Sequence, residues 1–339
     1  MKLLITGGGG FVGSRLASTL LARGQLAGQK IHSIVLADQV APRPELLADS
    51  RVQARTGALL TQCAQLREES FDGVFHLASA VSGECEADFE LGLRSNLDST
   101  RALLDGLRLN VAGGGAVPRV VFSSSVAVFG PDASVPMPPL VGDDTLPAPQ
   151  TSYGAQKLIC EHLVSDYTRK GYIDGRSARL MTVTVRPGRP NGAASSFFSG
   201  IIREPLAGEE AILPVDMDVS HPVSSPALTI EGLIRVFEAS RTELGGRLAL
   251  NLPALNVRVG DMLAALESVA GKKVRERVRH VRDERIAGIV ANWPKGATFA
   301  RATHLGLKPA ASFADIVRQY IDDCRNSPNA QTTLQGMLR

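Results

Sequence analysis

The first residues of the sequence place an apolar strand, a glycine-rich turn and the start of a helix in direct succession. Lys2–Thr6 is mostly aliphatic, Gly7-Gly8-Gly9-Gly10-Phe11-Val12-Gly13 follows it, and apolar residues then recur at helical spacing through Gly13–Arg23. Four glycines can form a plain loop. In this position they instead allow a tight turn and a close approach of backbone to phosphate. The helix start would then bind a dinucleotide, and the candidate contacts are Gly7, Gly10, Phe11, Val12 and Gly13.

Further short aliphatic runs recur along the chain with amphipathic segments between them. The expected strands are Lys2–Thr6, Ile31–Ala37, Gly73–Leu77, Val117–Phe122, Met181–Val185 and Leu248–Leu252. The expected helices are Gly13–Arg23, Asp88–Leu109 and Tyr153–Arg169. Apolar strands alternating with helices are typical of βαβ units with a buried parallel sheet. The sequence therefore predicts an α/β fold with a doubly wound parallel (Rossmann) sheet and a second, smaller substrate-binding lobe.

The character of the sequence changes after about residue 188, where paired serines and phenylalanines appear among glycines. We expect residues 1–188 and about 222–254 to form the dinucleotide-binding domain. Residues 189–221 and about 255–330 would form the smaller lobe, and 331–339 a tail. The segment Pro131–Pro149 is rich in proline and aspartate and predicts a long loop, which inside a compact domain is usually functional. The polar stretch from Asn326 onward is expected to be loosely ordered.

The composition argues against several classes of protein. The 339 residues are 44% hydrophobic and 21% charged, as is usual for globular chains, so disorder over most of the length is excluded. The net charge of +3 comes with no basic block, which argues against nucleic-acid binding. No apolar run is long enough to span a membrane, and Leu3-Leu4-Ile5 is too short for an export signal. We therefore expect a cytoplasmic protein.

The cysteines show no pattern of a metal site or a disulfide framework. There is neither a Cys-x-x-Cys spacing nor a nearby pair of histidines. We expect reduced, mostly buried thiols and no bound metal. The four residues are Cys63, Cys85, Cys160 and Cys324.

Asp38 ends the second expected strand, about 25 residues after Gly13. This is near the distance at which an acidic side chain binds the ribose hydroxyls of a dinucleotide. A carboxylate there favours NAD over NADP, because two like charges about 4 Å apart repel by about 4 kcal/mol at an effective dielectric constant of about 20. Asp38 could instead be a solvated residue at a strand end, and Arg43 is near enough in sequence to leave NADP open.

Tyr153 and Lys157 lie four residues apart, and hence on one face of the expected helix. About one tyrosine in a thousand is ionised at pH 7, and lowering its pKa to about 7 requires about 4 kcal/mol of preferential stabilisation of the phenolate. A neighbouring lysine and a cationic nicotinamide could supply it. Ser125 ends the expected strand Val117–Phe122 and its serine run, where ligands gather in open α/β sheets. The serines could also serve only the turn.

These residues together resemble the extended short-chain dehydrogenase/reductase family, which includes NAD-dependent epimerases and dehydratases. The resemblance rests on the glycine turn, His76-Leu77-Ala78-Ser79, Asn96, Ser125 and the Tyr153/Lys157 pair. It covers nearly the whole chain and implies that Ser125 and Tyr153 contact the reacting hydroxyl, that Lys157 binds the nicotinamide ribose, and that the protein is a homodimer. It also implies cofactor contacts from Leu77, Ala78, Ser79, Asn96, Ser123, Pro187 and Gly188.

The resemblance is incomplete at the expected adenine site. Gly57-Ala58-Leu59 stands where many relatives carry an aspartate beside the adenine. Any contact with the adenine there would have to come from the backbone.

The expected substrate follows from Arg186-Pro187-Gly188-Arg189-Pro190-Asn191. Nucleotide-sugar epimerases of the family usually carry an asparagine at the position of Arg189. An arginine binds a carboxylate through two parallel hydrogen bonds, which suits a small polyhydroxy acid; Arg189 could also bridge the two lobes through a salt bridge. The expected substrate contacts are Ser79, Ser125, Tyr153, Arg189, Asn191 and Ser195.

This run and Ser220-His221-Pro222-Val223-Ser224 resemble the D-erythronate dehydrogenases, the sugar-acid branch of the family. The resemblance implies oxidation of the C2 hydroxyl of a four-carbon aldonate to the 2-oxo acid with NAD⁺. Tyr153 would take the hydroxyl proton, Ser125 would hold the oxygen and Asn96 would support a water relay. His221 could touch the substrate or be purely structural.

Other functions stay open at this point. A nucleotide-sugar epimerase or dehydratase would keep its NAD tightly bound and release no NADH. A dehydrogenase of other small alcohols, such as amino alcohols, would use the same groups. A non-catalytic NAD(P)-sensing protein would not need Ser125, Tyr153 and Lys157 together, so their presence argues against that class.

Overall fold

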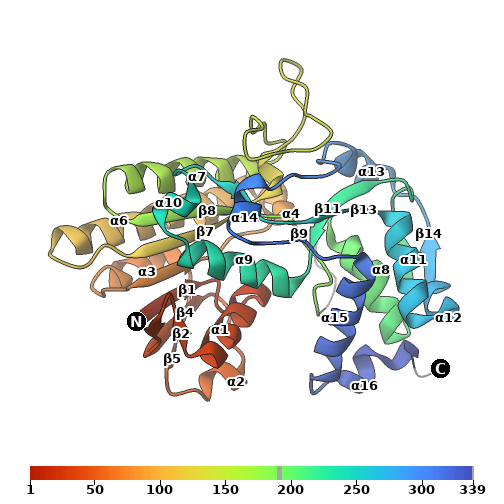
Figure 1. Ribbon diagram of the computed structural model, residues 1–339, viewed down its shortest axis with the longest axis horizontal. Coiled ribbons are helices and arrows are strands. Elements are labelled where there is room, and N and C mark those ends of the chain that lie inside the picture. Colours follow the sequence, from red (N-terminus) through yellow and green to blue (C-terminus); the bar gives the residue numbers. More distant parts are fainter. Residues whose placement is uncertain (189–192, 338–339) are drawn as a thin grey trace.

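The computed structural model describes residues 1–188 and 193–337 (Figure 1). Its centre is a parallel seven-stranded sheet in the order β12-β8-β7-β6-β1-β4-β5. The strand order reverses at β1, as in a doubly wound fold, and ligands bind at the carboxyl ends of the strands at such a point. The predicted α/β fold is confirmed. The strands are β1 Lys2–Thr6, β4 Ser33–Asp38, β5 Val52–Thr56, β6 Gly73–His76, β7 Arg119–Ser125, β8 Asp174–Leu180 and β12 Leu250–Asn251.

Helices cover both faces of this sheet (Figure 1). Alternate residues of β1 point to opposite faces: Leu3 and Ile5 belong to the core that packs against α1 and α9, and Leu4 belongs to the core beneath α3, α6 and α7. None of the described helices is long and apolar enough to cross a membrane. These helices are α1 Phe11–Arg23, α9 Pro226–Glu238, α3 Leu59–Leu66, α6 Ser99–Ala112 and α7 Ser152–Arg169.

One expected strand is wrong. Met181–Val185 does not form a strand of the central sheet; that place is taken by β8, which ends at Leu180. Thr182–Val183 (β9) leaves the sheet and pairs in parallel with Ser220–Ser224 (β11). The prediction failed because β8 carries two buried arginines, Arg176 and Arg179, and charged residues are untypical of a central strand.

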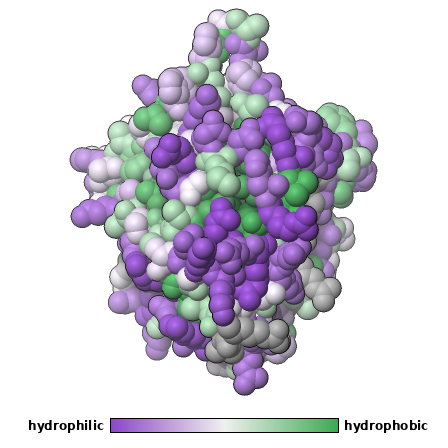
Figure 2. All heavy atoms as spheres, turned by 90° about the vertical axis from the view of Figure 1, so that its right-hand side faces the viewer, coloured by the Kyte–Doolittle hydropathy of each residue, from purple (hydrophilic) through white to green (hydrophobic). Residues whose placement is uncertain are grey.

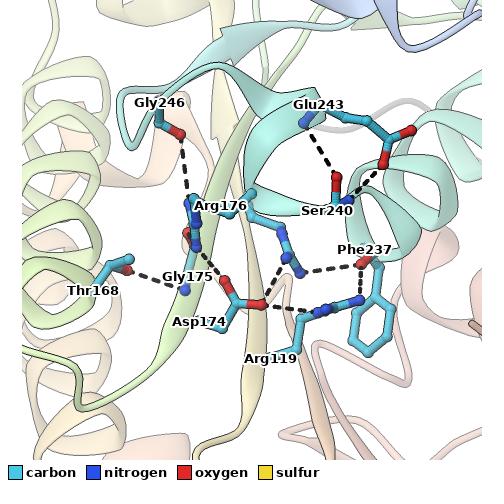
Figure 3. Close-up of polar contacts among 10 residues, drawn as sticks. Arg119, Thr168, Asp174, Gly175, Arg176, Phe237, Ser240, Glu243 and Gly246 are labelled. Atoms are coloured by element: carbon cyan, nitrogen blue, oxygen red, sulfur yellow. Dashed lines mark hydrogen bonds and ion pairs between the residues drawn. The ribbon is translucent and has the colours of Figure 1, made fainter.

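A cluster of ion pairs makes the burial of Arg176 possible (Figure 3). The Asp174 carboxylate accepts hydrogen bonds from Arg176 Nη2 (2.7 Å) and Arg119 Nε (3.0 Å), and it also pairs with Arg241. Arg119 and Arg176 each donate a second bond to the carbonyl oxygen of Phe237, at the end of α9. The cluster therefore ties the beginnings of β7 and β8 to the helix that covers them.

Two other elements differ from the expected ones. The exposed edge strand β5 was not expected, since its sequence Val-Gln-Ala-Arg-Thr lacks an apolar run. The helix expected over Asp88–Leu109 is divided: α5 spans Phe89–Gly92, a π-helical segment spans Leu93–Asp98, and α6 follows.

A second hydrophobic core lies beyond the sheet, on the right in Figure 1. Figure 2 looks onto this end of the molecule, whose surface is mostly hydrophilic with a hydrophobic area near the centre. The boundaries between a dinucleotide-binding domain and a substrate lobe stay a prediction. The core is built from α8 Ser196–Ala207, β10 Ala211–Leu213, β11, β13 Leu255–Arg258, α11 Val259–Ala270, β14 Val278–His280, α13 Glu284–Ala291 and α15 Phe313–Arg325.

Shorter elements complete the described chain. They are β2 Gln25–Leu26, β3 Gln29–Lys30, α2 Pro44–Leu47, α4 Ser82–Ala87, a 3-10 turn Val126–Val128, α10 Arg241–Leu244, α12 Lys272–Arg275, α14 Ala300–His304, α16 Ala330–Thr333 and a second 3-10 turn Gln335–Met337. The segment Pro131–Pro149 forms the expected long loop, without helix or strand.

The loosely ordered tail expected from Asn326 onward is wrong for the described residues. The chain turns back through α16 onto α8, and Leu334 is buried in the second core. Gly336 lies so close to α8 that a Cβ atom there would be 2.2 Å from the carbonyl oxygen of Pro205. One apolar side chain and one close backbone contact hold this segment in place. The sequence gives little indication of them, because the surrounding residues are polar.

Candidate active site

The glycine turn lies between β1 and α1, as predicted. Gly7 has a φ of +72°, which favours glycine. A Cβ atom on Gly13 would lie 2.1 Å from the carbonyl oxygen of Gly7, and one on Gly7 would lie 2.7 Å from the Ala78 nitrogen. The absence of side chains at Gly7 and Gly13 therefore lets α1 start directly against β1 and β6, which leaves its N-terminal N–H groups for a phosphate.

Asp38 lies at the end of β4, beside this turn. Its carboxylate oxygen Oδ2 accepts hydrogen bonds from the Gly9 and Gly10 nitrogens, at 2.9 and 3.1 Å, and Oδ1 accepts one from Val40. This carboxylate is thus held next to the phosphate-binding turn, as a ribose-binding group requires. Its contact with a ribose stays a prediction.

Buried hydrogen bonds connect the glycine turn to the loop after β6. Thr6 Oγ1 accepts from the nitrogens of Leu77 and Ala78, so its own hydrogen goes to His76 Nδ1 (2.7 Å). His76 Nε2 is then the protonated nitrogen, and it donates to Thr100 Oγ1 (2.8 Å). A neutral histidine thereby fixes the position of Leu77–Ser79, the segment expected to line the cofactor.

The Asn96 side chain is buried and hydrogen-bonded within the protein, and its expected cofactor contact and proton-relay role stay predictions. Its Oδ1 accepts from the Ala80 nitrogen (2.7 Å) and Ser79 Oγ (2.9 Å), and its Nδ2 donates to Gln156 Oε1 (2.7 Å) and Cys85 Sγ (3.3 Å). The π-helical turn directs this side chain into the protein, so that it positions the loop that carries Ser79.

Ser125 and Tyr153 meet in one cleft at the carboxyl end of β7. The Ser125 hydroxyl is near enough to lower the pKa of the Tyr153 phenol, and Ser125 Oγ accepts a hydrogen bond from the Ala127 nitrogen (3.1 Å). Tyr153 is brought there because α7 begins with Thr151 as its cap, whose hydroxyl accepts from the Gly154 nitrogen (3.1 Å). A Cβ atom on Gly154 would be 2.2 Å from the Ala127 carbonyl oxygen, so glycine permits this close approach.

Lys157 lies one turn further along α7 and is buried. Its Nζ donates to the Ser123 carbonyl oxygen (2.9 Å) and lies 4.9 Å from the ring centre of Phe122 and 5.5 Å from that of Tyr153. Burial lowers the pKa of Lys157 to about 8. The amine therefore contacts both the strand end and the tyrosine ring.

The expected lowering of the pKa of Tyr153 to about 7 relies on Lys157 and a cationic nicotinamide together, and it stays a prediction. Burial raises this pKa to about 12, and the hydrogen bond from Ser125 and the charge of Arg186 offset only part of the effect. The Lys157 ammonium is directed at a carbonyl oxygen and the ring face instead of the hydroxyl oxygen. The phenol is accordingly protonated at neutral pH.

A buried ion pair sits behind this group. Glu161, one turn beyond Lys157, accepts from Arg179 Nε and Nη2, both at 2.8 Å, and from Ser124 Oγ (2.5 Å). Both charged side chains are only 6% exposed. The pair fastens α7 to β7 and β8, and so holds the tyrosine and lysine in position over the strand ends.

The expected substrate residues are only partly brought together. Ser79 and Ser195 line the same cleft as Ser125 and Tyr153. Arg189 and Asn191 lie outside the described residues. Pro187 and Gly188 are exposed, and their cofactor contacts stay predictions, as does that of Ser123, which lines the cleft.

His221 borders the cleft, but both of its ring nitrogens are used within the protein. Nδ1 donates to the Pro294 carbonyl oxygen (3.1 Å), so the neutral ring accepts at Nε2 from Thr182 Oγ1 (2.7 Å). The ring stacks on Phe198 with centres 5.1 Å apart and also contacts Trp293. The structural interpretation of His221 therefore accounts for all of its contacts.

Arg186 is a cleft residue that the sequence analysis missed, because it assigned the anion-binding role to Arg189. The side chain lines the cleft, and its charge acts on Tyr153. Among the described residues, no hydrogen-bond or ion-pair partner of its guanidinium is found. Its only signal in the sequence was its position, three residues after the end of β9.

The two buried histidines predict a loss of stability in mild acid. Burial lowers the pKa of His76 to about 3 and that of His221 to about 4, below about 6.5 for an unfolded chain. Between these pKa values the unfolded state binds more protons than the folded state. The free energy of unfolding should therefore decrease as the pH is lowered. The stabilisation is complete above about pH 6.5, and two such groups together cost about 3 kcal/mol per pH unit from about pH 6 to 4.

Urea midpoints measured at several pH values check this expectation. Replacing the exposed His32 by glutamine should leave the slope unchanged. A midpoint that stays constant between pH 7 and 5 would contradict the burial of neutral rings.

Comparisons with known proteins agree with this geometry. The model of the NAD dependent epimerase/dehydratase family matches residues 3–221. A D-erythronate dehydrogenase of Cupriavidus necator is 46% identical, over 95% of this chain and 98% of that protein. One of Haemophilus influenzae is 39% identical, over 95% and 99%. A crystal structure described as a nucleoside-diphosphate-sugar epimerase from Agrobacterium tumefaciens has a TM-score of 0.90 and 41% identity, and covers 95% of this chain and 94% of that one.

Proposed function

The chain belongs to the NAD-dependent epimerase/dehydratase family, and from that premise we propose that it oxidises the C2 hydroxyl of a small sugar acid of the D-erythronate type to the 2-oxo acid. It is an NAD-dependent oxidoreductase acting on CH–OH groups. The observation that carries the proposal is that Ser125, Tyr153 and Lys157 line one cleft at the carboxyl ends of the strands.

The residues expected to bind a dinucleotide lie at the same carboxyl edge of the sheet as this cleft. The glycine turn has no side chain that obstructs the start of α1, and the Asp38 carboxylate lies beside it. When bound, NAD⁺ accepts the hydride from the substrate carbon. The glycine turn would hold its phosphates, Asp38 the adenosine ribose, and Lys157 the nicotinamide ribose.

The protein's own groups then handle the proton. Ser125 would hold the substrate oxygen through a hydrogen bond, and Tyr153 would take the hydroxyl proton as hydride leaves the carbon. The positive charge of Arg186 favours the phenolate. Because burial raises the pKa of Tyr153, oxidation should speed up as the pH rises above neutral.

The charge at the cleft mouth supports a small acid over a nucleotide diphosphate. The described residues lining the outer part of the cleft include four carboxylates and a single arginine, Arg285. Carboxylates repel a diphosphate, which carries more negative charge than a monocarboxylate. The carboxylates are Glu86, Glu204, Glu209 and Glu210. The names of the two D-erythronate dehydrogenase relatives support the same choice.

The test mixes purified protein with NAD⁺ and D-erythronate and follows NADH absorbance. We expect NADH in proportion to the acid consumed, and the 2-oxo acid as product. A nucleotide-sugar epimerase, as the Agrobacterium structure is described, would turn over UDP-galactose without net NADH. Turnover of UDP-galactose and none of any small aldonate would overturn the proposal. The expected homodimer stays a prediction, which the mass in solution tests.

A further inference from the structure

Backbone hydrogen bonds hold Arg186 in position at the side of the cleft. Its backbone nitrogen donates to Ser199 Oγ (3.0 Å), and its carbonyl oxygen accepts from Arg203 Nη1 (2.8 Å). Both partners belong to α8, and Ser199 Oγ is itself hydrogen-bonded to Thr184 Oγ1 (2.9 Å). The backbone of Arg186 is therefore fixed on either side of the residue, which limits where its side chain can reach.

The guanidinium of Arg186 has no anion among the described residues. Burial lowers its pKa, and the neighbouring Arg203 lowers it further. Two other cations nearby are already paired: Arg203 binds Glu204 at 2.6 Å, and Lys157 donates to the Ser123 carbonyl oxygen. No anion lies beside this partly buried guanidinium in the described part of the chain, so an anionic ligand at Arg186 would supply charge-assisted hydrogen bonds.

The position of this charge also restricts the geometry of a ligand. Arg186 is close enough to Tyr153 for its charge to stabilise the phenolate, and both line the cleft with Ser125. Because both groups border one cleft of about 310 Å³, a ligand with one oxygen at the Ser125–Tyr153 pair and an anionic group at Arg186 must be small. Adjacent carbons, as in a 2-hydroxy acid, satisfy this requirement.

We propose that Arg186 binds the substrate carboxylate and so selects acids whose reacting hydroxyl is on the neighbouring carbon. The inference rests on the proposed function, since it names the group that recognises the acid in that site. Arg186 would then have the carboxylate-binding role that was expected of Arg189. Two parallel N–H···O bonds from the guanidinium would fix the carboxylate plane, which turns the C2 hydroxyl toward Tyr153.

The test compares D-erythronate with its uncharged amide, D-erythronamide. For R186Q we expect kcat/KM for the acid to fall about 30- to 1000-fold, as expected for loss of a charge-assisted pair, while kcat/KM for the amide changes by less than about threefold. R186K keeps the charge but not the paired geometry, and should lie between. An acid without a C2 hydroxyl, 3,4-dihydroxybutyrate, should not be oxidised by any form.

A second readout does not depend on turnover. With the protein saturated with NADH, calorimetric titration of D-erythronate should show weaker binding to R186Q, with unchanged affinity for NADH. The matched control is R247Q, which removes one charge from an exposed residue that does not line the cleft and should leave both readouts unchanged.

The outcomes separate the two proposals. Equal losses for acid and amide in R186Q, unchanged use of the acid, or oxidation of 3,4-dihydroxybutyrate would overturn the role of Arg186. Wild-type protein that binds D-erythronate through Arg186 but never oxidises it would overturn the proposed function while the role of Arg186 stands. Failure of the wild type to bind any small hydroxy acid would overturn both.

Discussion

Replacing Tyr153 by phenylalanine should lower kcat/KM for the oxidation by about 10²–10⁴-fold. The change removes the hydroxyl that shares the cleft with Ser125 and leaves the ring beside Lys157. The fold and the glycine turn do not depend on this hydroxyl, so the affinity for NAD⁺ should stay within a few fold. Steady-state NADH formation measures the first quantity, and fluorescence titration of NADH measures the second.

The matched control for this variant lies on the same helix. Tyr167 donates a hydrogen bond to Asp105 (2.8 Å) and does not line the cleft, so Tyr167→Phe removes one hydroxyl from α7 without touching the site. It should keep nearly full activity. Tyr153→Phe with more than about a tenth of the wild-type rate would rule out the tyrosine as general base.

The second large effect concerns stability, at the opposite end of the strands. Asp174→Ala should lower the free energy of unfolding by about 2–4 kcal/mol, because it leaves the buried Arg176 without its carboxylate. The side chain of Arg176 is 1% exposed and that of Asp174 is 31% exposed, so water compensates part of the loss. Burial disfavours the Asp174 carboxylate, yet Arg176 and Arg241 still hold its pKa below the usual range.

Urea denaturation of the purified variant measures this loss. The matched control is Asp166→Ala, which breaks an exposed pair with Arg169 whose side chains are 56% and 53% exposed, and should cost less than about 1 kcal/mol. Equal effects of the two substitutions would show that the Asp174 cluster is no stronger than a surface pair.

The residues that the sequence identified are those whose role depends on neighbours in the chain. The turn at Gly7 and Gly13 is recognisable because a strand and a helix flank it, and Tyr153 and Lys157 face one side because they are four residues apart. Ser125 was found from its position at a strand end. Each of these inferences needs only local geometry, which sequence spacing specifies.

The sequence was a poor guide where partners come from distant parts of the chain. Nothing near Asn96 in sequence shows that Ser79 and Gln156 occupy its amide. Strand β8 was misplaced because Arg179 is neutralised by Glu161, a residue of the preceding helix. The burial that raises the pKa of Tyr153 in the chain alone follows from packing that no spacing rule describes.

The sequence by itself therefore determined the doubly wound sheet, the dinucleotide turn and the tyrosine–lysine–serine group, since these follow from periodicity and short spacings. Only the tertiary structure decided that Arg186 enters the cleft, that Asn96 serves the scaffold, and that His221 is held between Thr182 and Pro294. The physical reason is that burial and pairing are set by which segments pack together. These quantities decide whether a charged or polar group is available to a ligand.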